Sequence, residues 1–182
     1  MANQTEEVLK GGAFLIEDID AEKMFTPEDY SDEHKMIAKT TQDYLVNEVI
    51  PQVEYLEEHE FDRSVKLLKQ AGELGLLGAD VPEEYGGLGL DKISSALITE
   101  KMAPAGGFSI THGAHVGIGS LPIVLFGNEE QKQKYLPLLA TGEKLAAYAL
   151  TEPSSGSDAL GAKTTAKLNE AKKAFEQDLQ KV

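Results

Sequence analysis

The chain has 182 residues, of which 41% are hydrophobic, so it can bury a core and is not disordered throughout. Its 31 acidic and 17 basic residues give a formal net charge of -14, which argues against nucleic-acid binding, because that depends on Lys and Arg neutralising phosphates. There is no cysteine, and therefore no disulfide, thiolate nucleophile or Cys-based zinc site. No apolar run is expected to span a membrane, residues 1–10 do not resemble a signal or transit peptide, and a cytoplasmic protein is expected.

Residues 1–30 are expected to form an amino-terminal arm, because a short apolar run at residues 13–16 needs something to pack against. The Thr-Pro pair at residues 26–27 is a helix-start signal. From Ser31 onward, helical spacing predicts a first helix, which Pro51 should end or bend. Its buried face would consist of Ile37, Thr41, Tyr44, Leu45 and Val49.

Two further helices are expected in the middle of the chain. Asp62 is expected to cap the second helix, which would bury Val65, Leu68 and Ala71. A third helix should run from Asp91 to about Met102. Residues 81–89 between them form a turn-rich loop, whose glycines lack the spacing of a nucleotide-binding fingerprint.

A fourth helix is expected to open at Ser109. Its glycines lower helix propensity, but they would let a neighbouring backbone approach closely. His112 and His115 lie one helical turn apart without an obvious third ligand, so core or substrate-channel lining is favoured and no metal site is predicted. The buried stripe of this helix would consist of Ile110, Ala114, Gly117, Ile118, Leu121 and Leu125.

Asn128 and Gln131 resemble a capping box for a fifth helix, and Pro137 leaves the end of that helix open. Residues 145–150 fit either a strand or a short helix. Residues 151–161 form a loop rich in Ser, Gly and Pro, and its hydroxyls and backbone N–H groups would suit a phosphate or a flavin edge. On texture alone, a solvated connector is the commoner meaning of such a loop.

Four segments occur in an order that carries more information than any one of them. Residues 149–161 read Ala-Leu-Thr-Glu-x-x-Ser-Gly-Ser-Asp-x-x-Gly, and residues 81–89 contain Pro-Glu-x-Tyr-Gly-Gly-x-Gly. Residues 127–137 and the Gly-Glu pair at 142–143 supply the other two segments. Over about residues 31–168 the chain therefore resembles the acyl-CoA dehydrogenase family.

The resemblance implies a mainly α fold, with an amino-terminal helical domain at residues 31–144. The start of a middle β domain would follow at residues 145–168, too short to close the family's barrel. The family's carboxy-terminal four-helix bundle would be missing. Residues 169–182 depart from the family, and their spacing predicts a short terminal helix with one face made of Ala171, Ala174, Phe175, Asp178 and Val182.

The resemblance also implies a reaction. In this family a glutamate base removes the α proton of an acyl-CoA while the β carbon delivers a hydride to N5 of FAD, giving a trans-2-enoyl-CoA. The reduced flavin then passes its electrons to an electron-transfer flavoprotein, and a homo-oligomer is expected. Because the arm resembles that of the very-long-chain branch, the substrate hypothesis is a long-chain acyl-CoA.

The family's cofactor segment falls on the Ser- and Gly-rich loop and the residues just before it. The resemblance implies that backbone groups of Tyr148, Ala149 and Leu150 flank the isoalloxazine ring. The Thr151 hydroxyl would bond near N5, and Ser157 would reach both the FAD pyrophosphate and the acyl-CoA. These roles suit a protein that orients a cofactor and leaves the chemistry to it.

Two carboxylates lie in the same loop. Glu152 is not expected to be the base, because a base must reach the α proton of the substrate and the family's base comes from the carboxy-terminal bundle. No catalytic residue is therefore assigned in this chain. Asp158 is expected to brace the loop by accepting backbone N–H bonds.

The leading interpretation is a part of an enzyme that is inactive alone, binds FAD weakly or not at all, and self-associates through uncovered apolar faces. The rival is a non-catalytic helical interaction or acyl-binding module derived from the family. A terminal helix that covers the open sheet edge would favour the rival.

Overall fold

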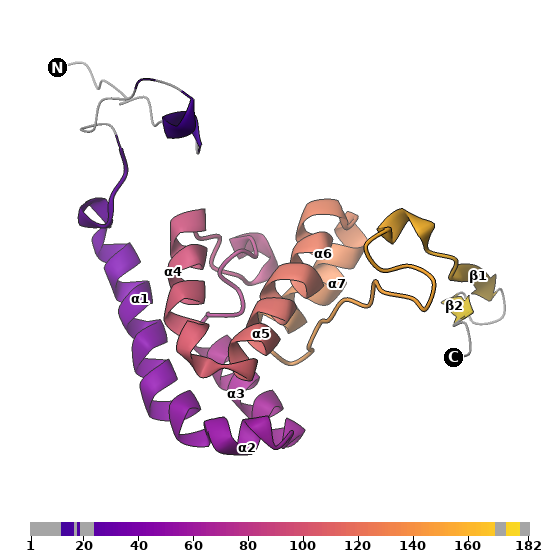
Figure 1. Cartoon of the computed structure of the whole chain (residues 1–182), viewed down its shortest axis with the longest axis horizontal. Coiled ribbons are helices and arrows are strands. Elements are labelled where there is room, and N and C mark those ends of the chain that lie inside the picture. The colour runs from indigo at the N-terminus through magenta and orange to yellow at the C-terminus, as the bar shows by residue number, and fades with distance from the viewer. Residues whose placement is uncertain (1–11, 17, 19–23, 170–173, 179–182) are drawn as a thin grey trace.

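The computed structural model describes residues 12–16, 18, 24–169 and 174–178. In these residues the fold is mainly α-helical, as predicted, and Figure 1 shows the helices packed into one body. The α-helices are α1 (Asp32–Tyr44), α2 (Val53–Glu57), α3 (Phe61–Glu73), α4 (Lys92–Met102), α5 (Gly107–Gly113), α6 (Leu121–Phe126) and α7 (Glu129–Ala140). The strands are β1 (Thr165–Asn169) and β2 (Ala174–Asp178).

Much of the predicted arm, residues 1–11, 17 and 19–23, lies outside the described residues. Leu15 and Ile16 of its apolar run are exposed. The Thr-Pro signal produces only a 3-10 turn, Pro27–Asp29, with a capping box on Thr26.

The first predicted helix is confirmed and begins where Ser31 accepts a hydrogen bond from the His34 N–H at 3.1 Å. After α1 the helical path continues through a π-helical segment, Leu45–Val49, a 3-10 turn, Ile50–Gln52, and α2. Pro51 therefore bends the path, as Figure 1 shows below α1. All of the side chains predicted for its buried face are buried: Ile37, Thr41, Tyr44, Leu45 and Val49.

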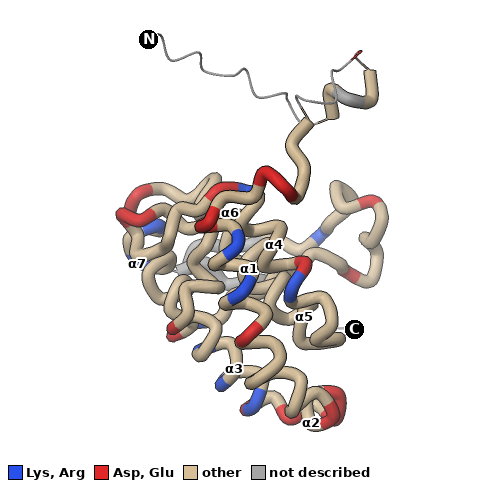
Figure 2. The backbone as a smooth tube through the Cα atoms, turned by 90° about the vertical axis from the view of Figure 1, so that its left-hand side faces the viewer, with Lys and Arg blue, Asp and Glu red and all other residues tan. Residues whose placement is uncertain are grey.

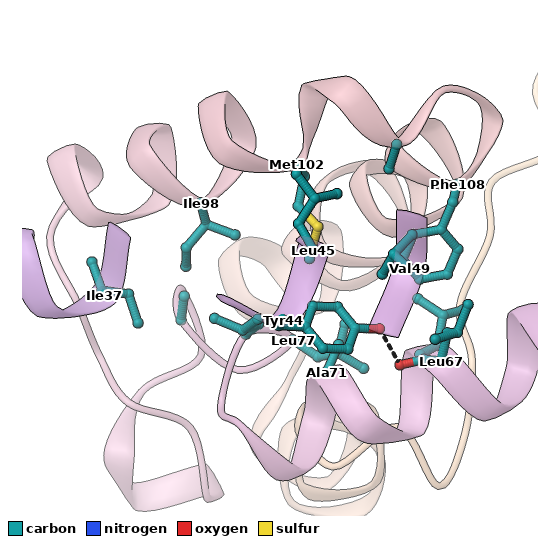
Figure 3. Close-up of a cluster of buried hydrophobic side chains, with 14 residues drawn as sticks. Ile37, Tyr44, Leu45, Val49, Leu67, Ala71, Leu77, Ile98, Met102 and Phe108 are labelled. Atoms are coloured by element: carbon teal, nitrogen blue, oxygen red, sulfur yellow. Dashed lines mark hydrogen bonds between the residues drawn. The ribbon is translucent and has the colours of Figure 1, made fainter. Parts of the chain in front are cut away.

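The core lies between α1, α3, α4 and α5, and Figure 3 shows it at close range. The Tyr44 hydroxyl donates a hydrogen bond of 2.7 Å to the backbone oxygen of Leu67 and so ties α1 to α3 inside the apolar cluster. Full burial of a side chain such as Leu67 stabilises the fold by about 1.5–3 kcal/mol. The other buried members include Leu45, Val49, Leu68, Ala71, Leu77, Ile98, Met102 and Phe108.

The predictions for the second and third helices are right in place and partly wrong in detail. α3 begins at Phe61 with Glu60 at the cap position, so Asp62 is not the cap. Asp62 lies in the first turn, where its negative charge interacts favourably with the positive end of the helix dipole. Leu68 is buried as predicted, together with Ala71, but Val65 is exposed at the surface. α4 is confirmed, capped by Asp91. Its cap carboxylate accepts the Ser94 N–H at 2.8 Å.

The predicted orientation of the fourth helix is wrong. The helical path runs from Gly107 through a π-helical segment, Ala114–Ser120, into α6. Three of the six residues of the predicted stripe are exposed, and Ala114, Gly117 and Leu121 are only half-buried. Ile110, Ile118 and Leu125 are 73%, 55% and 64% exposed. The face turned inward carries Phe108, His112, His115 and Ser120. Three of these side chains are polar, so a search for an apolar stripe does not find this face.

The same stretch corrects the expectation about membrane spans. Gly107–Phe126 is long and apolar enough to cross a membrane by length and composition alone, because its 20 residues include no charged side chain. Core helices of soluble proteins pass the same test, so this is weak evidence for a span.

α7 is confirmed with its capping box. Asn128 Oδ1 accepts the Gln131 N–H at 2.8 Å, and Gln131 Oε1 accepts the Asn128 N–H at 2.9 Å. Pro137 lies inside the helix, which ends at Ala140. Gly142 follows with a φ of 72°, a conformation that glycine adopts without strain.

Beyond the helices the chain forms an extended linker, a loop and a hairpin. Residues 145–150 are neither a strand nor a helix, and residues 151–161 form the predicted loop with a 3-10 turn at Ala159–Gly161. β1 and β2 pair antiparallel, with Leu168 opposite Phe175.

The terminal helix predicted for residues 169–182 is therefore wrong at Ala174–Asp178, which form β2. Pairing with β1 gives the backbone groups of this segment their partners, and the mixed polar and apolar sequence does not distinguish that arrangement from a helix. Residues 170–173 and 179–182 of the predicted tail lie outside the described residues.

Candidate functional site

The linker after α7 is attached to the helical domain by a buried histidine. The Ala146 N–H donates to His115 Nδ1 at 3.0 Å, so that nitrogen is unprotonated. His115 Nε2 lies 3.0 Å from the Leu139 oxygen and donates its proton there. Burial lowers the pKa of His115, and the bond to Leu139 offsets this only in part. The ring is thus a neutral bridge between α7 and the linker.

A glycine lets the linker lie against the helix. A Cβ added to Gly119 would come within 2.7 Å of the Ala146 Cβ and within 2.8 Å of its carbonyl carbon. Real side chains do not tolerate such contacts, so the absence of a side chain at Gly119 permits the approach. The prediction that glycines in this helix admit a neighbouring backbone is confirmed here.

The linker then presents the predicted flavin-contacting residues to solvent. Tyr148, Ala149, Leu150 and Thr151 are all exposed. Within the described part of the chain, their backbone groups and the Thr151 hydroxyl form no hydrogen bond. A cofactor edge that lies along this segment would therefore find donors and acceptors that need not first break a protein contact.

The loop that follows is closed by Glu152. Its carboxylate accepts the Lys163 N–H at 2.7 Å through Oε2 and the Thr164 N–H at 3.0 Å through Oε1. Hydrogen bonds from Thr164 and Lys163 hold the pKa of Glu152 below its usual value. At the other end of the same turn, the Glu152 N–H donates to the Ser155 oxygen at 2.9 Å.

The prediction for Asp158 is wrong in its chemistry. In the described residues its carboxylate accepts no hydrogen bond, and Glu152 braces the loop instead. Asp158 contributes only its backbone oxygen, which accepts the Ser155 hydroxyl at 2.6 Å. Sequence reasoning missed Ser155, which is buried, because a serine in a Ser-rich loop gives no signal that its side chain turns inward.

Ser157 is exposed, and no hydrogen bond joins it to Tyr148–Thr151 in the described residues. The loop supplies one cation, Lys163, beside two carboxylates, so an anionic pyrophosphate would depend on hydroxyl and backbone N–H donors. The donors present fit one edge of a flavin cofactor, and they do not by themselves enclose it.

The cavities described next lie in the helical domain, and residues 145–161 line none of them. His112 lies on two of them, of about 40 and about 150 Å³. Its Nε2 is buried without a hydrogen-bond partner among the described residues. Both histidines are buried, His112 at 2% and His115 at 1% exposure, which agrees with the prediction that they line the core. The described residues hold no cluster of three or more His, Asp or Glu suited to a metal.

Comparison with known proteins decides the family. Residues 31–143 match the model of the acyl-CoA dehydrogenase N-terminal domain. The chain belongs to the acyl-CoA dehydrogenase family. A probable acyl-CoA dehydrogenase of Bacillus subtilis is 72% identical over 171 residues, which cover 94% of this chain and 29% of that protein.

Two more relatives add detail. The crystal structure of an acyl-CoA dehydrogenase complexed with FAD from Bacillus anthracis is similar with a TM-score of 0.87 and 77% identity, over 93% of this chain and 29% of that one. A human very long-chain specific acyl-CoA dehydrogenase is 52% identical over 95 residues, covering 52% of this chain and 14% of that protein. The chain thus spans less than a third of the length of each of these relatives.

Proposed function

We propose that this chain supplies the helical domain and the flavin-contacting loop of an FAD-dependent acyl-CoA dehydrogenase. The observation that carries the proposal is the anchored linker, which ends in the exposed segment Tyr148–Thr151, whose backbone groups form no hydrogen bond with the described residues. These are the positions that the family resemblance assigns to the flavin, and the similar Bacillus anthracis protein is an FAD complex.

In this proposal the chain orients the cofactor. Backbone groups of Tyr148, Ala149 and Leu150 flank the flavin ring, and the Thr151 hydroxyl donates near N5. Ser157 reaches the pyrophosphate and the thioester end of the substrate. When bound, FAD would accept a hydride from the β carbon of an acyl-CoA and pass the electrons to an electron-transfer flavoprotein.

The base of the reaction is not proposed among the described residues. Glu152 is the carboxylate nearest in sequence to Thr151, and both of its oxygens already accept backbone N–H bonds. A base must lie within reach of the α proton of the substrate, and these two bonds hold the carboxylate against its own backbone. We place the base in the part of the relatives that lies outside the stretch matched by this chain.

The outward face of the α5–α6 path supports a role as part of a larger body. Ile110, Ile118 and Leu125 form an uncharged exposed surface, and exposed apolar surfaces of this kind mark interaction sites. We propose that the remaining polypeptide of a dehydrogenase covers this face in a homo-oligomeric, cytoplasmic enzyme. In the chain alone, the same face would lead to self-association.

Charge restricts where the substrate approaches. Figure 2 shows acidic residues gathered at α2, where the sequence supplies Glu54, Glu57 and Glu58. The phosphates of coenzyme A would be repelled there. The thioester is expected on the side of the flavin-contacting loop. The long-chain substrate remains a hypothesis that rests on the resemblance of the amino-terminal arm.

The rival function, a non-catalytic interaction or acyl-binding module, has lost the feature that favoured it. A terminal helix was to cover the open sheet edge, and Ala174–Asp178 form a strand of that sheet instead.

A reconstitution experiment tests the proposal. The chain is mixed with a separately produced polypeptide that carries the remaining part of the Bacillus subtilis relative, and each is also tested alone. We expect the mixture to retain yellow flavin through gel filtration and to oxidise a long-chain acyl-CoA with an electron-transfer flavoprotein as acceptor. The chain alone should do neither.

Two variants sharpen the test. Thr151→Ala should lower the rate of flavin reduction in the mixture, whereas Ser154→Ala, an exposed hydroxyl in the same loop, should not. Stoichiometric flavin on the chain alone would contradict the proposed division of the cofactor site. Turnover of short acyl-CoAs alone would remove the long-chain preference.

A further inference from the structure

Glu152 joins two parts of the chain that sequence order keeps apart. One residue of the turn that starts the loop accepts hydrogen bonds from two consecutive amides, Lys163 at 2.7 Å and Thr164 at 3.0 Å. Thr164 directly precedes β1, so the carboxylate attaches the beginning of the loop to the beginning of the hairpin.

The bonds inside the loop complete a closed ring. The Ser155 N–H donates to the Glu152 oxygen at 3.1 Å, and the Ser155 hydroxyl donates to the Asp158 oxygen at 2.6 Å. Gly161 closes the last turn by donating to the same Asp158 oxygen at 3.0 Å. The segment between Glu152 and Thr164 is thus held at both ends by the clamp and internally by the bonds to the Glu152 and Asp158 oxygens.

Both proposed cofactor contacts are next to these attachment points. Thr151 immediately precedes Glu152, and Ser157 lies between Ser155 and Asp158. Two hydroxyls that meet different parts of one bound cofactor act best at a separation that is set before the cofactor arrives, and a flexible loop does not supply it. Donors that are already held in place lose less conformational entropy when the ligand binds.

We propose that Glu152 is a positioning residue, which sets the flavin-contacting loop in its binding shape by clamping the amides of Lys163 and Thr164. This inference rests on the proposed function. It gives the acidic residue of the family signature a role that is not catalytic, since its two oxygens are held by backbone amides of its own chain.

The first test uses the chain without cofactor and follows backbone amide exchange by NMR. In Glu152→Ala the Lys163 and Thr164 amides should exchange faster, on the order of tenfold or more, because each loses a bond to a charged acceptor. Glu152→Gln, which keeps one acceptor oxygen, should be intermediate. Asp158→Asn is the matched control, since that carboxylate accepts no hydrogen bond in the described residues, and it should leave both amides unchanged.

A second readout links the clamp to the flavin. In the reconstituted mixture, Glu152→Ala should weaken FAD retention and shift the flavin absorption bands, and Glu152→Gln should restore part of both. Thermal unfolding of the helical domain should not change, because the loop lies outside the core.

The outcomes separate the two proposals. If the unsubstituted mixture takes up no FAD, the proposed function fails, whatever the amides do. If the unsubstituted mixture takes up FAD but Glu152→Ala exchanges, binds and absorbs as before, the positioning role is refuted. Faster amide exchange with unchanged FAD retention and spectrum would reduce Glu152 to a structural brace and would also refute it.

Discussion

Mild acid should destabilise the helical domain through His112. This side chain is 2% exposed, and its Nε2 has no hydrogen-bond partner in the described residues. Burial is the main reason that the pKa of His112 falls to about 4, with a smaller lowering from His115, while a backbone hydrogen bond to Leu76 opposes the change. The fold therefore holds the imidazole neutral.

The sign and size follow from proton linkage. Below the ordinary value of 6.5 the unfolded chain binds a proton on His112 that the folded chain does not bind, so stability falls as the pH falls. The loss is about 1.36 kcal/mol per pH unit, or roughly 2 kcal/mol at about pH 5, and it stops growing near the folded pKa. A carboxylate with a lowered pKa, such as Glu152, reduces the stability of the fold only when the pH falls below its usual pKa of 4.5. Its effect therefore lies in a lower pH range than that of His112.

Urea unfolding at a series of pH values between about 7 and 5 measures this effect. The chain should lose stability across the range, and His112→Leu should lose about 2 kcal/mol less. His59→Asn, which removes an exposed histidine, is the control and should keep the slope of the parent chain. Equal slopes for the parent and His112→Leu would show that the buried ring is not held neutral, and the reasoning would fail.

Three other substitutions test the packing. Gly119→Ala should displace the linker and lower the free energy of unfolding by about 1–3 kcal/mol through steric overlap. Gly117→Ala is the control: nothing lies within 4 Å of its added Cβ, so it should stabilise the helix slightly. Thermal unfolding compares the two variants. Tyr44→Phe should lower the free energy of unfolding in urea by about 0.5–1.5 kcal/mol, because the Leu67 oxygen loses the hydrogen bond from the hydroxyl. Ile118→Ser should change stability by less than about 0.5 kcal/mol yet reduce self-association in sedimentation; a variant that associates as before would show that this face is not involved.

Local signals predicted the fold where the determining contacts lie close in sequence. The predicted capping box of Asn128 and Gln131 needed only a partner three residues away. The third helix, predicted to run from Asp91, begins at a cap of the same reach. The buried face of α1 followed from spacing alone, since one side of that helix is polar.

The errors arose where the partner lies elsewhere. Helical spacing identifies an apolar stripe but not what covers it, so Ile110 and Leu125 were assigned to the core although the core side carries His115. Likewise, Glu152 and Asp158 look equally suited to brace a loop. Only the fold brings the Lys163 amide to one of them, 11 residues along the chain.

The contact between Gly119 and Ala146 determines how far the flavin-contacting segment can swing. Because the Ala146 amide is bound to His115 and its backbone lies against the helix, Ala146 acts as a pivot. An extended chain covers about 3.4 Å per residue, so Thr151 stays within roughly 17 Å of that pivot in any conformation. The search volume open to its hydroxyl is therefore limited before any flavin arrives.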